Sequence, residues 1–251
     1  PHINAGAGGY FAPFIREYIR RYDAPEHIGW KVAVKDRLNA LKNPLAHLHI
    51  PGIDEKMVSD TPMLWEPLRY LESCPSSDGA CAMVITSKDL VGSRDVAWIK
   101  GMAVRSEGTL SAGRDEVNPQ AGIDCAKDIY DQAGITNPYK EIDCAEIYVP
   151  FSWYEPMWLE NLGFCDLGEG WKLTDKDATA IDGEMPFNMS GGVMSSNPIG
   201  ASGMIRFGEA ALQVMDKAND HQVEDAKVAM GHAYGGAAQF FAMWIVSSSL
   251  D

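Results

Sequence analysis

The chain has 251 residues, of which 46% are hydrophobic and 22% are charged, a composition that is typical of folded globular proteins and excludes extensive disorder. Acidic residues outnumber basic ones by 35 to 21, and the net charge of −14 argues against nucleic acids or anionic membranes as partners. No apolar run approaches the roughly 18 residues of a membrane span. The first residues also lack the basic segment of a secretory signal, so we expect a cytoplasmic protein.

The first 76 residues predict a helical region rich in loops. Residues 10–22 and residues 28–41 place apolar side chains at helical spacing. Loops that contain proline follow up to residue 67. This region therefore does not resemble a layer of a regular sheet.

From residue 77 onward the pattern alternates between strands and helices. Residues 77–86 predict a turn followed by a short apolar strand, and residues 96–106 predict a second strand. Residues 120–135 predict an amphipathic helix. A buried strand is expected over 143–149, and a further helix over 152–162.

The C-terminal part predicts one more helix and one more strand. A glycine-bearing loop over 187–204 leads into a helix over 204–217. Residues 231–237 predict a glycine turn, and the apolar run 238–248 predicts a central strand. Strands that alternate with helices favour an α/β fold in which both faces of the sheet are covered.

The five cysteines do not predict a metal site or a disulfide framework, because their number is odd and no C-x-x-C motif occurs. They are Cys74, Cys81, Cys125, Cys144 and Cys165. We interpret Cys81, Cys125 and Cys144, which lie in apolar segments, as small buried residues. A reducing compartment fits this pattern.

Three loops next to predicted strands are candidates for chemistry. Residues 148–155 follow the end of a strand, where side chains point into a crevice. Residues 191–203 precede a helix whose first amides could bind an anion or an enolate oxygen. Residues 231–236 contain His232 and Tyr234. Each loop taken alone is more often a packing device than a site.

In their order and spacing these segments resemble the thiolase superfamily, in its lipid-transfer-protein branch. The matching segments are KNPLAHLHI (42–50), SDGACAMVI (77–85), AGIDCAKDIYDQAGI (121–135), PFSWYEPMWLENLGF (150–164) and SGGVMSSNPIGASGM (190–204). The resemblance implies a layered αβαβα core in which the C-terminal half is complete and the N-terminal half is largely missing.

The same resemblance implies three regions of the chain. Residues 1–76 are similar to the loop domain of that family. Residues 77–90 are similar to the last strand of the N-terminal half, and residues 91–251 to the C-terminal half.

The chain departs from the family at the residues that carry thiolase chemistry. Tyr148 stands where the family has an active-site histidine, and Asn197 replaces the histidine of its Gly-His-Pro motif. The last glycine turn contains His232 and Tyr234 but no cysteine. Thiolase chemistry needs an activated thiolate and a His/Cys acid–base set, so we do not expect thiolytic or Claisen activity.

These departures resemble the thiolase-like aldolases of bacterial steroid side-chain degradation, which work with an OB-fold partner of the DUF35 type. The resemblance implies retro-aldol cleavage of a β-hydroxyacyl-CoA into a ketosteroid and propionyl-CoA or acetyl-CoA. Coenzyme A is then part of the substrate, and no separate cofactor or metal is expected. The resemblance also implies a homodimer within a hetero-oligomer.

The resemblance implies catalytic roles for four side chains. Tyr148 is the first candidate for proton transfer, and Asn197 is a candidate donor to the enolate oxygen. His232 or Tyr234 could supply an acid or a relay. Structural interpretations stay open for all four, since each side chain can also serve packing, and asparagine before proline is common in turns.

The substrate is expected to contact an apolar pocket. Its candidate residues are Tyr154, Trp158, Phe187, Met194, Gly192 and Gly200. The phosphates of coenzyme A could meet basic residues of the first region, namely Arg16, Arg20, Arg21, Lys31 and Lys35. A solvated helix face explains these charges equally well.

Two other functions stay open. The chain could be a catalytically silent subunit that scaffolds a partner acyl-CoA protein. It could also be an authentic thiolase, an acyltransferase or a lipid-binding module; the thiolase requires a cysteine with a low pKa.

Overall fold

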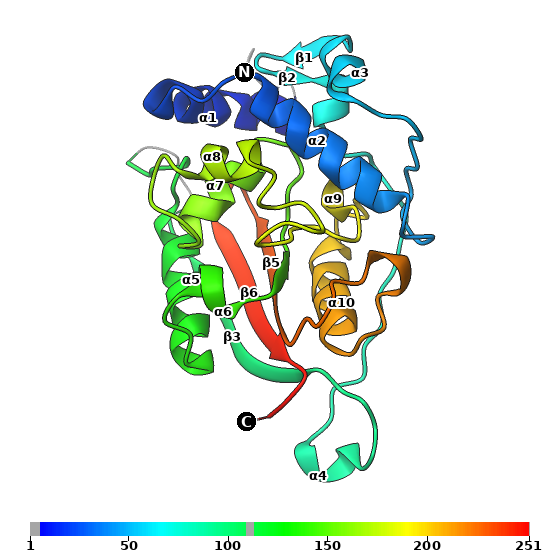
Figure 1. Ribbon diagram of the computed structural model, residues 1–251. Coiled ribbons are helices and arrows are strands. Elements are labelled where there is room, and N and C mark those ends of the chain that lie inside the picture. Colours follow the sequence, from blue (N-terminus) through cyan, green and yellow to red (C-terminus); the bar gives the residue numbers. More distant parts are fainter. Residues whose placement is uncertain (1–5, 109–112, 251) are drawn as a thin grey trace.

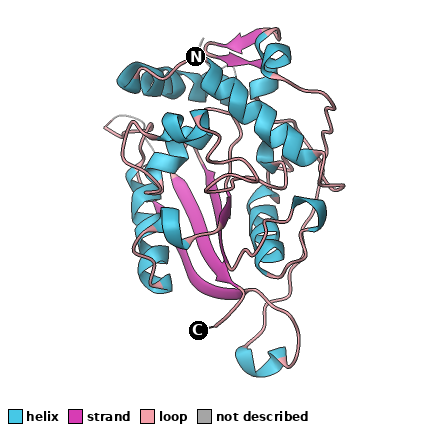
Figure 2. Cartoon of the chain, viewed as in Figure 1, coloured by secondary structure: helices cyan, strands magenta, loops and turns pink. Residues whose placement is uncertain are grey.

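A four-stranded mixed sheet flanked by helices forms the centre of the computed structural model, which describes residues 6–108 and 113–250 (Figure 1; Figure 2). The strand order is β3 (Trp98–Ser106), β6 (Phe240–Ser247), β5 (Val228–Gly235) and β4 (Cys144–Glu146). Strands β4 and β5 are parallel, and the other two pairs are antiparallel. The α/β fold and the central position of the last strand are thus as predicted, whereas residues 1–5 of the first predicted region lie outside the described residues.

Side chains of the central strand β6 alternate between the two faces of the sheet, which explains why its sequence is apolar throughout. Met243 and Ile245 lie in the core cluster that includes helix α5 (Gln120–Ala133), and Trp244 lies in the cluster that includes helix α10 (Ser202–Val214). In Figure 1, α5 and α10 accordingly lie on opposite sides of the sheet.

Short helices connect these elements. They are α6 (Pro138–Glu141), α7 (Tyr154–Asn161), α8 (Gly170–Asp175), α9 (Gly192–Ser195) and the 3-10 helix η2 (Asn219–His221). The predicted helices over 120–135, 152–162 and 204–217 correspond to α5, α7 and α10. None of the helices in the described ranges is long and apolar enough to cross a membrane.

The N-terminal region packs across one end of the sheet (Figure 1). Its elements are α1 (Gly6–Tyr22), α2 (His27–Ala40), α3 (Glu55–Ser59), the hairpin β1 (Met63–Trp65) and β2 (Leu68–Arg69), and the 3-10 helix η1 (Tyr70–Glu72). Both predicted helices are present. Helix α1 buries Ala12, Ile15 and Tyr18, which recur at the spacing of one helical face.

A short antiparallel contact joins this region to the loop that follows β4. The Cys74 amide donates to the Pro150 carbonyl at 2.8 Å, and the Ser152 amide donates to the Glu72 carbonyl at 3.0 Å. Ser73 forms an isolated bridge with Phe151 between these two hydrogen bonds. Residues 72–74 are therefore fixed against the segment that begins at the strand end.

The prediction of a strand over residues 77–86 is wrong. Residues 74–87 have no regular secondary structure, and the side chains of Val84 and Ile85 are 96% and 72% exposed. A strand needs a neighbour that satisfies its backbone groups, and no described strand pairs with this segment. The short helix α4 (Lys88–Val91) follows it.

The prediction of a glycine turn over 231–237 is correct only at its end, because β5 continues to Gly235 and the turn occupies residues 236–239. Gly231 lies in this strand, where a Cβ atom would come within 1.8 Å of the indole nitrogen of Trp244. Glycine thus permits close packing here rather than a turn.

The expectation that both sheet faces are covered fails at β3, where Met102 and Val104 are exposed.

Candidate functional site

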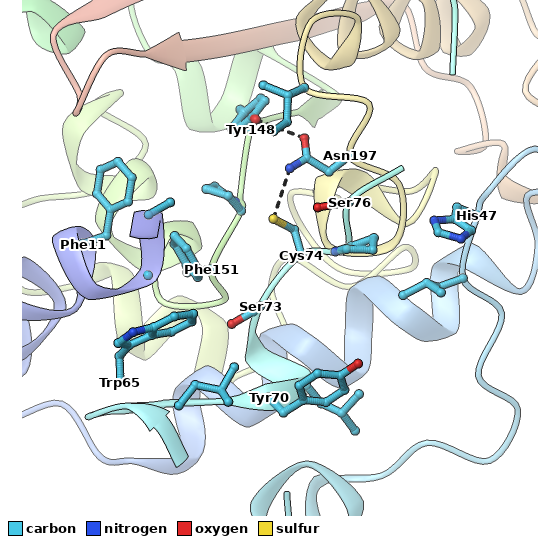
Figure 3. Close-up of a pocket in the computed structure, with 18 of the residues that line it drawn as sticks. Phe11, His47, Trp65, Tyr70, Ser73, Cys74, Ser76, Tyr148, Phe151 and Asn197 are labelled. Atoms are coloured by element: carbon cyan, nitrogen blue, oxygen red, sulfur yellow. Dashed lines mark hydrogen bonds between the residues drawn. The ribbon is translucent and has the colours of Figure 1, made fainter. Parts of the chain in front are cut away.

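A cavity of about 820 Å³ lies between the N-terminal region and the loops at the end of the sheet, within the usual size range of ligand pockets (Figure 3). Its apolar wall includes Phe11, Leu64, Trp65, Phe151 and Ile199. Its polar wall includes Arg37, His47, Tyr70, Ser73, Cys74, Tyr148, Asn197 and Tyr234.

Asn197 is the centre of a hydrogen-bonded cluster in the polar wall. Its side-chain carbonyl accepts from the Tyr148 hydroxyl at 3.1 Å and from the Ser202 hydroxyl at 2.8 Å. Its amide nitrogen donates to the Cys74 sulfur at 3.1 Å. Figure 3 shows Asn197 between Tyr148 and Cys74, so the two residues predicted to act together do lie together.

Three separate chain segments hold this cluster in place. Tyr148 follows β4 by two residues, and its carbonyl accepts from the indole of Trp158 at 2.9 Å. Asn197 precedes α10, and its backbone amide donates to the Ser77 hydroxyl at 3.0 Å. Cys74 is fixed by the backbone contact with Pro150.

Burial raises the pKa of Tyr148 to about 12, and a smaller lowering comes from its bond to Asn197. At neutral pH the Tyr148 side chain is therefore a neutral hydroxyl that can donate a proton. A tyrosinate at this position would have to form against the cost of burying a charge.

Tyr234 lines the cavity and packs edge-on against Tyr148, with ring centroids 5.3 Å apart. Its hydroxyl is buried and finds no hydrogen-bond partner among the residues of the described ranges. Tyr154 and Trp158, predicted to bind substrate, are fully buried and pack behind Tyr234 at 5.7 and 5.0 Å, outside the cavity wall. They support the site rather than face it.

His232 is fully buried beneath Tyr148, and its Nδ1 accepts from the Tyr148 backbone amide at 3.3 Å. Burial lowers the pKa of His232 to about 3, so the imidazole is neutral at pH 7. His232 lies outside the cavity wall and supports the backbone at Tyr148.

This burial predicts a pH-dependent stability. The unfolded chain protonates the His232 imidazole below its ordinary pKa of 6.5, but the folded chain only below about 3. The free energy of unfolding should therefore fall as the pH drops from 6.5 towards 4, by up to about 1.4 kcal/mol per pH unit from this group. Urea unfolding of the wild type and of His232→Asn at several pH values measures this fall. A free energy of unfolding that falls equally with pH in both proteins would contradict the assignment.

The other residues predicted to bind substrate lie away from the cavity. Phe187 packs edge-on against Phe164 at 5.2 Å, and Met194 is fully buried in the core. Gly192 is buried with a φ of 57°, beside Asn188. Gly200 is exposed, and its neighbour Ile199 lines the cavity instead.

Sequence reasoning missed the contributions of the N-terminal region to the site. Phe11, Trp65 and Cys74 lie in the cavity wall, but nothing in their spacing relates them to Tyr148. Arg37 places a positive charge in the cavity lining, and its guanidinium donates to the carbonyls of Leu71 and Ser73. Of the basic residues predicted to meet coenzyme A, Lys35 is buried in ion pairs with Asp36 and Glu155.

None of the five cysteines has the electrostatic environment of a nucleophile. Burial raises the pKa of all of them, to about 12 for Cys125 and Cys165. The prediction of burial is confirmed for Cys125 and Cys144, whereas Cys81 is partly exposed.

We therefore expect iodoacetamide at pH 7 to alkylate every cysteine more slowly than a thiol in an unstructured peptide, because alkylation requires the thiolate. Intact-mass spectrometry followed by peptide mapping measures the rates. One cysteine that reacts faster than the peptide would restore a thiolase-type nucleophile.

Comparisons with known proteins agree with this architecture. Residues 103–248 match the profile of the family described as thiolase C-terminal domain-like. Acetyl-CoA acetyltransferase of Methanothermobacter thermautotrophicus is 30% identical over 94% of this chain and 62% of its own length. Human sterol carrier protein 2 is 30% identical over 88% of this chain and 41% of its own length.

A solved structure, described as "Ltp2-ChsH2(DUF35) aldolase", superimposes with a TM-score of 0.85 at 25% identity, over 97% of this chain and 64% of that one. The chain thus spans only 41% to 64% of the length of these three proteins. The match covers both the sheet and the helices that position the cavity. The chain belongs to the thiolase C-terminal domain-like family, in the lipid-transfer-protein branch of the thiolase superfamily.

Proposed function

We propose that the chain acts as an acyl-CoA retro-aldolase. The substrate is a β-hydroxyacyl-CoA with a steroid side chain, and the products are a ketosteroid and propionyl-CoA or acetyl-CoA. The observation that carries the proposal is the hydrogen bond of 3.1 Å between Tyr148 and Asn197 in the wall of the cavity. The likeness to a solved aldolase chain supports it.

The reaction moves one proton from oxygen to carbon. The bond between Cα and Cβ breaks, the β-hydroxyl loses its proton to become a ketone, and the electron pair passes into the thioester enolate. The enolate then takes a proton at Cα. A neutral tyrosine suits this exchange if the two transfers are concerted: Tyr148 passes its own proton to Cα as it accepts the proton of the β-hydroxyl, so the side chain stays neutral.

Asn197 would stabilise the enolate. Its carbonyl is occupied by two hydroxyl donors, which orients the amide nitrogen towards Cys74 and the cavity. An amide N–H in this position can donate to the thioester oxygen as negative charge develops there. Tyr234, with its buried hydroxyl beside Tyr148, is a second candidate for proton transfer.

The raised pKa values of the cysteines speak against the thiolase alternative for this chain. A retro-aldol cleavage forms no covalent thioester with the protein. Coenzyme A enters as part of the substrate, and the proposed chemistry uses no other cofactor. A DUF35-type protein, the partner in the name of the similar structure, is the proposed partner of a homodimer of this chain.

The test is product formation from a steroid β-hydroxyacyl-CoA thioester, with and without a co-expressed DUF35-type partner. Mass spectrometry should detect the short acyl-CoA and the ketosteroid in equal amounts. Cleavage of the matching β-ketoacyl-CoA on addition of free coenzyme A, with the β-hydroxyacyl-CoA left intact, would indicate thiolysis. No cleavage with the partner bound would favour the silent-subunit function, which the exposed apolar segment around Val84 and Ile85 makes the second candidate.

A further inference from the structure

A buried ion pair lies directly behind the cavity wall. Arg206 of α10 contacts Glu146 at the end of β4, and both side chains are at most 2% exposed. The carboxylate of Glu146 also accepts from the backbone amide and the hydroxyl of Ser190, both at 2.9 Å. Arg206 donates to the same hydroxyl at 2.9 Å, which closes a triad of hydrogen-bonded side chains.

The three members of this triad lie on three segments that lead towards Tyr148 and Asn197. Glu146 precedes Tyr148 by two residues on β4. Ser190 lies in the loop that leads through α9 to Asn197. Arg206 lies one helical turn after Ser202, the residue that donates to the Asn197 carbonyl.

We infer that the Arg206–Glu146 ion pair is a positioning device that holds Tyr148 and Asn197 within hydrogen-bond distance, an inference that rests on the proposed function. A buried carboxylate that loses its partner is strongly unfavourable, so the two charges hold β4 and α10 in one relative position. The Ser190 hydroxyl ties the intervening loop to both charges. Backbone hydrogen bonds of Ala145 with Pro186 and Asn188 hold only the start of this loop against β4. The triad extends that hold to the later part of the loop and to α10, and so keeps Tyr148 and Asn197 at a fixed separation.

A second buried pair on the same helix provides a matched control. Glu209 follows Arg206 by three residues, and its carboxylate contacts His221 at 2.9 Å. This pair links α10 to the 3-10 helix η2 and does not contact β4. Glu209→Gln therefore removes a buried charge of the same helix and leaves every hydrogen bond of the triad in place.

The first experiment is a double-mutant cycle on kcat. Arg206→Lys should lower kcat by about 10- to 100-fold with KM changed less than about threefold, because a small misplacement of catalytic groups mainly affects turnover. In an Asn197→Ala background the same change should cost less than about threefold, since the hydrogen bond between Tyr148 and Asn197 that the ion pair maintains is already gone. Equal losses in both backgrounds, or an equal loss in Glu209→Gln, would overturn the inference.

A second readout does not depend on activity. Fluorotyrosine in place of Tyr148 reports the environment of that ring by fluorine NMR. Arg206→Lys should shift or broaden its resonance, and Glu209→Gln should leave it unchanged. If Arg206→Lys does not fold, Ser190→Ala, which removes only the bridging hydroxyl, should give a smaller change of the same kind.

The two readouts separate the inference from the proposed function. A wild-type protein without retro-aldol turnover, but with the expected fluorine shift in Arg206→Lys, would refute the function and support positioning. An unchanged resonance in both Arg206→Lys and Ser190→Ala would refute positioning whatever the activity.

Discussion

Tyr148→Phe should lower kcat for retro-aldol cleavage by about 10²- to 10⁴-fold, the usual contribution of a positioned acid–base group. The variant keeps the ring that packs against Tyr234 and loses only the hydroxyl that donates to Asn197. KM should change little, because the hydroxyl acts on the reacting atoms. Steady-state kinetics with the partner bound measures both constants.

Tyr139→Phe is the control for this experiment, because the Tyr139 hydroxyl bonds to Glu184 at an exposed position away from the cavity. It should retain full turnover. If Tyr148→Phe still forms product at the wild-type rate, the proposed reaction stands but Tyr148 does not transfer the proton. Tyr234 would then be the next residue to test.

The protonation state of Tyr148 gives this prediction a pH dependence. Because its pKa is raised to about 12, the hydroxyl stays neutral at ordinary pH. A relay that uses the neutral hydroxyl should give a kcat that is nearly constant between about pH 7.5 and pH 9.5. A rate that rises tenfold per pH unit across this range would instead identify a tyrosinate base.

Asn197→Ala is the second change with a large expected effect. Removing one preorganised donor to a developing oxyanion costs roughly 10²- to 10³-fold in kcat. The Tyr148 and Ser202 hydroxyls also lose their common acceptor, which adds to the loss. Single-turnover kinetics with saturating substrate separates this loss from a change in binding.

Asn161→Ala is the matched control, since Asn161 is equally buried and donates to Asn118 and the Pro119 carbonyl, outside the cavity wall. We expect this variant to lose thermal stability and keep turnover. An Asn197→Ala enzyme with wild-type kcat would show that Asn197 only holds the turn before Pro198.

Local periodicity was sufficient to predict the elements that bury one face or lie in the core. Helices α1, α2 and α5 and the central strand β6 follow from it. The segment around Val84 was misassigned because a strand depends on neighbours that local sequence cannot reveal. Gly231 was assigned to a turn because the sequence does not show that Trp244 packs against it.

The candidate site could be predicted only where it lies at strand and helix ends. Tyr148 and Asn197 were both expected there, and the structure places them in contact. Tyr154 and Trp158 were expected to face substrate, but α7 turns them towards the core behind Tyr234. Cys74 contacts Asn197 because its backbone pairs with Pro150, which is more than 70 residues away in the sequence. No local sequence pattern encodes such a contact.

The most direct test of the proposed reaction is cleavage of the β-hydroxyacyl-CoA in deuterated water without added coenzyme A. Retro-aldol cleavage places one solvent-derived deuterium on the α-carbon of the released acyl-CoA, because the enolate takes its proton from an exchangeable hydroxyl. We predict a released acyl-CoA that carries one deuterium, formed in equal amount to the ketosteroid. A cleavage that requires free coenzyme A, or an acyl-CoA without deuterium, would contradict the proposed function.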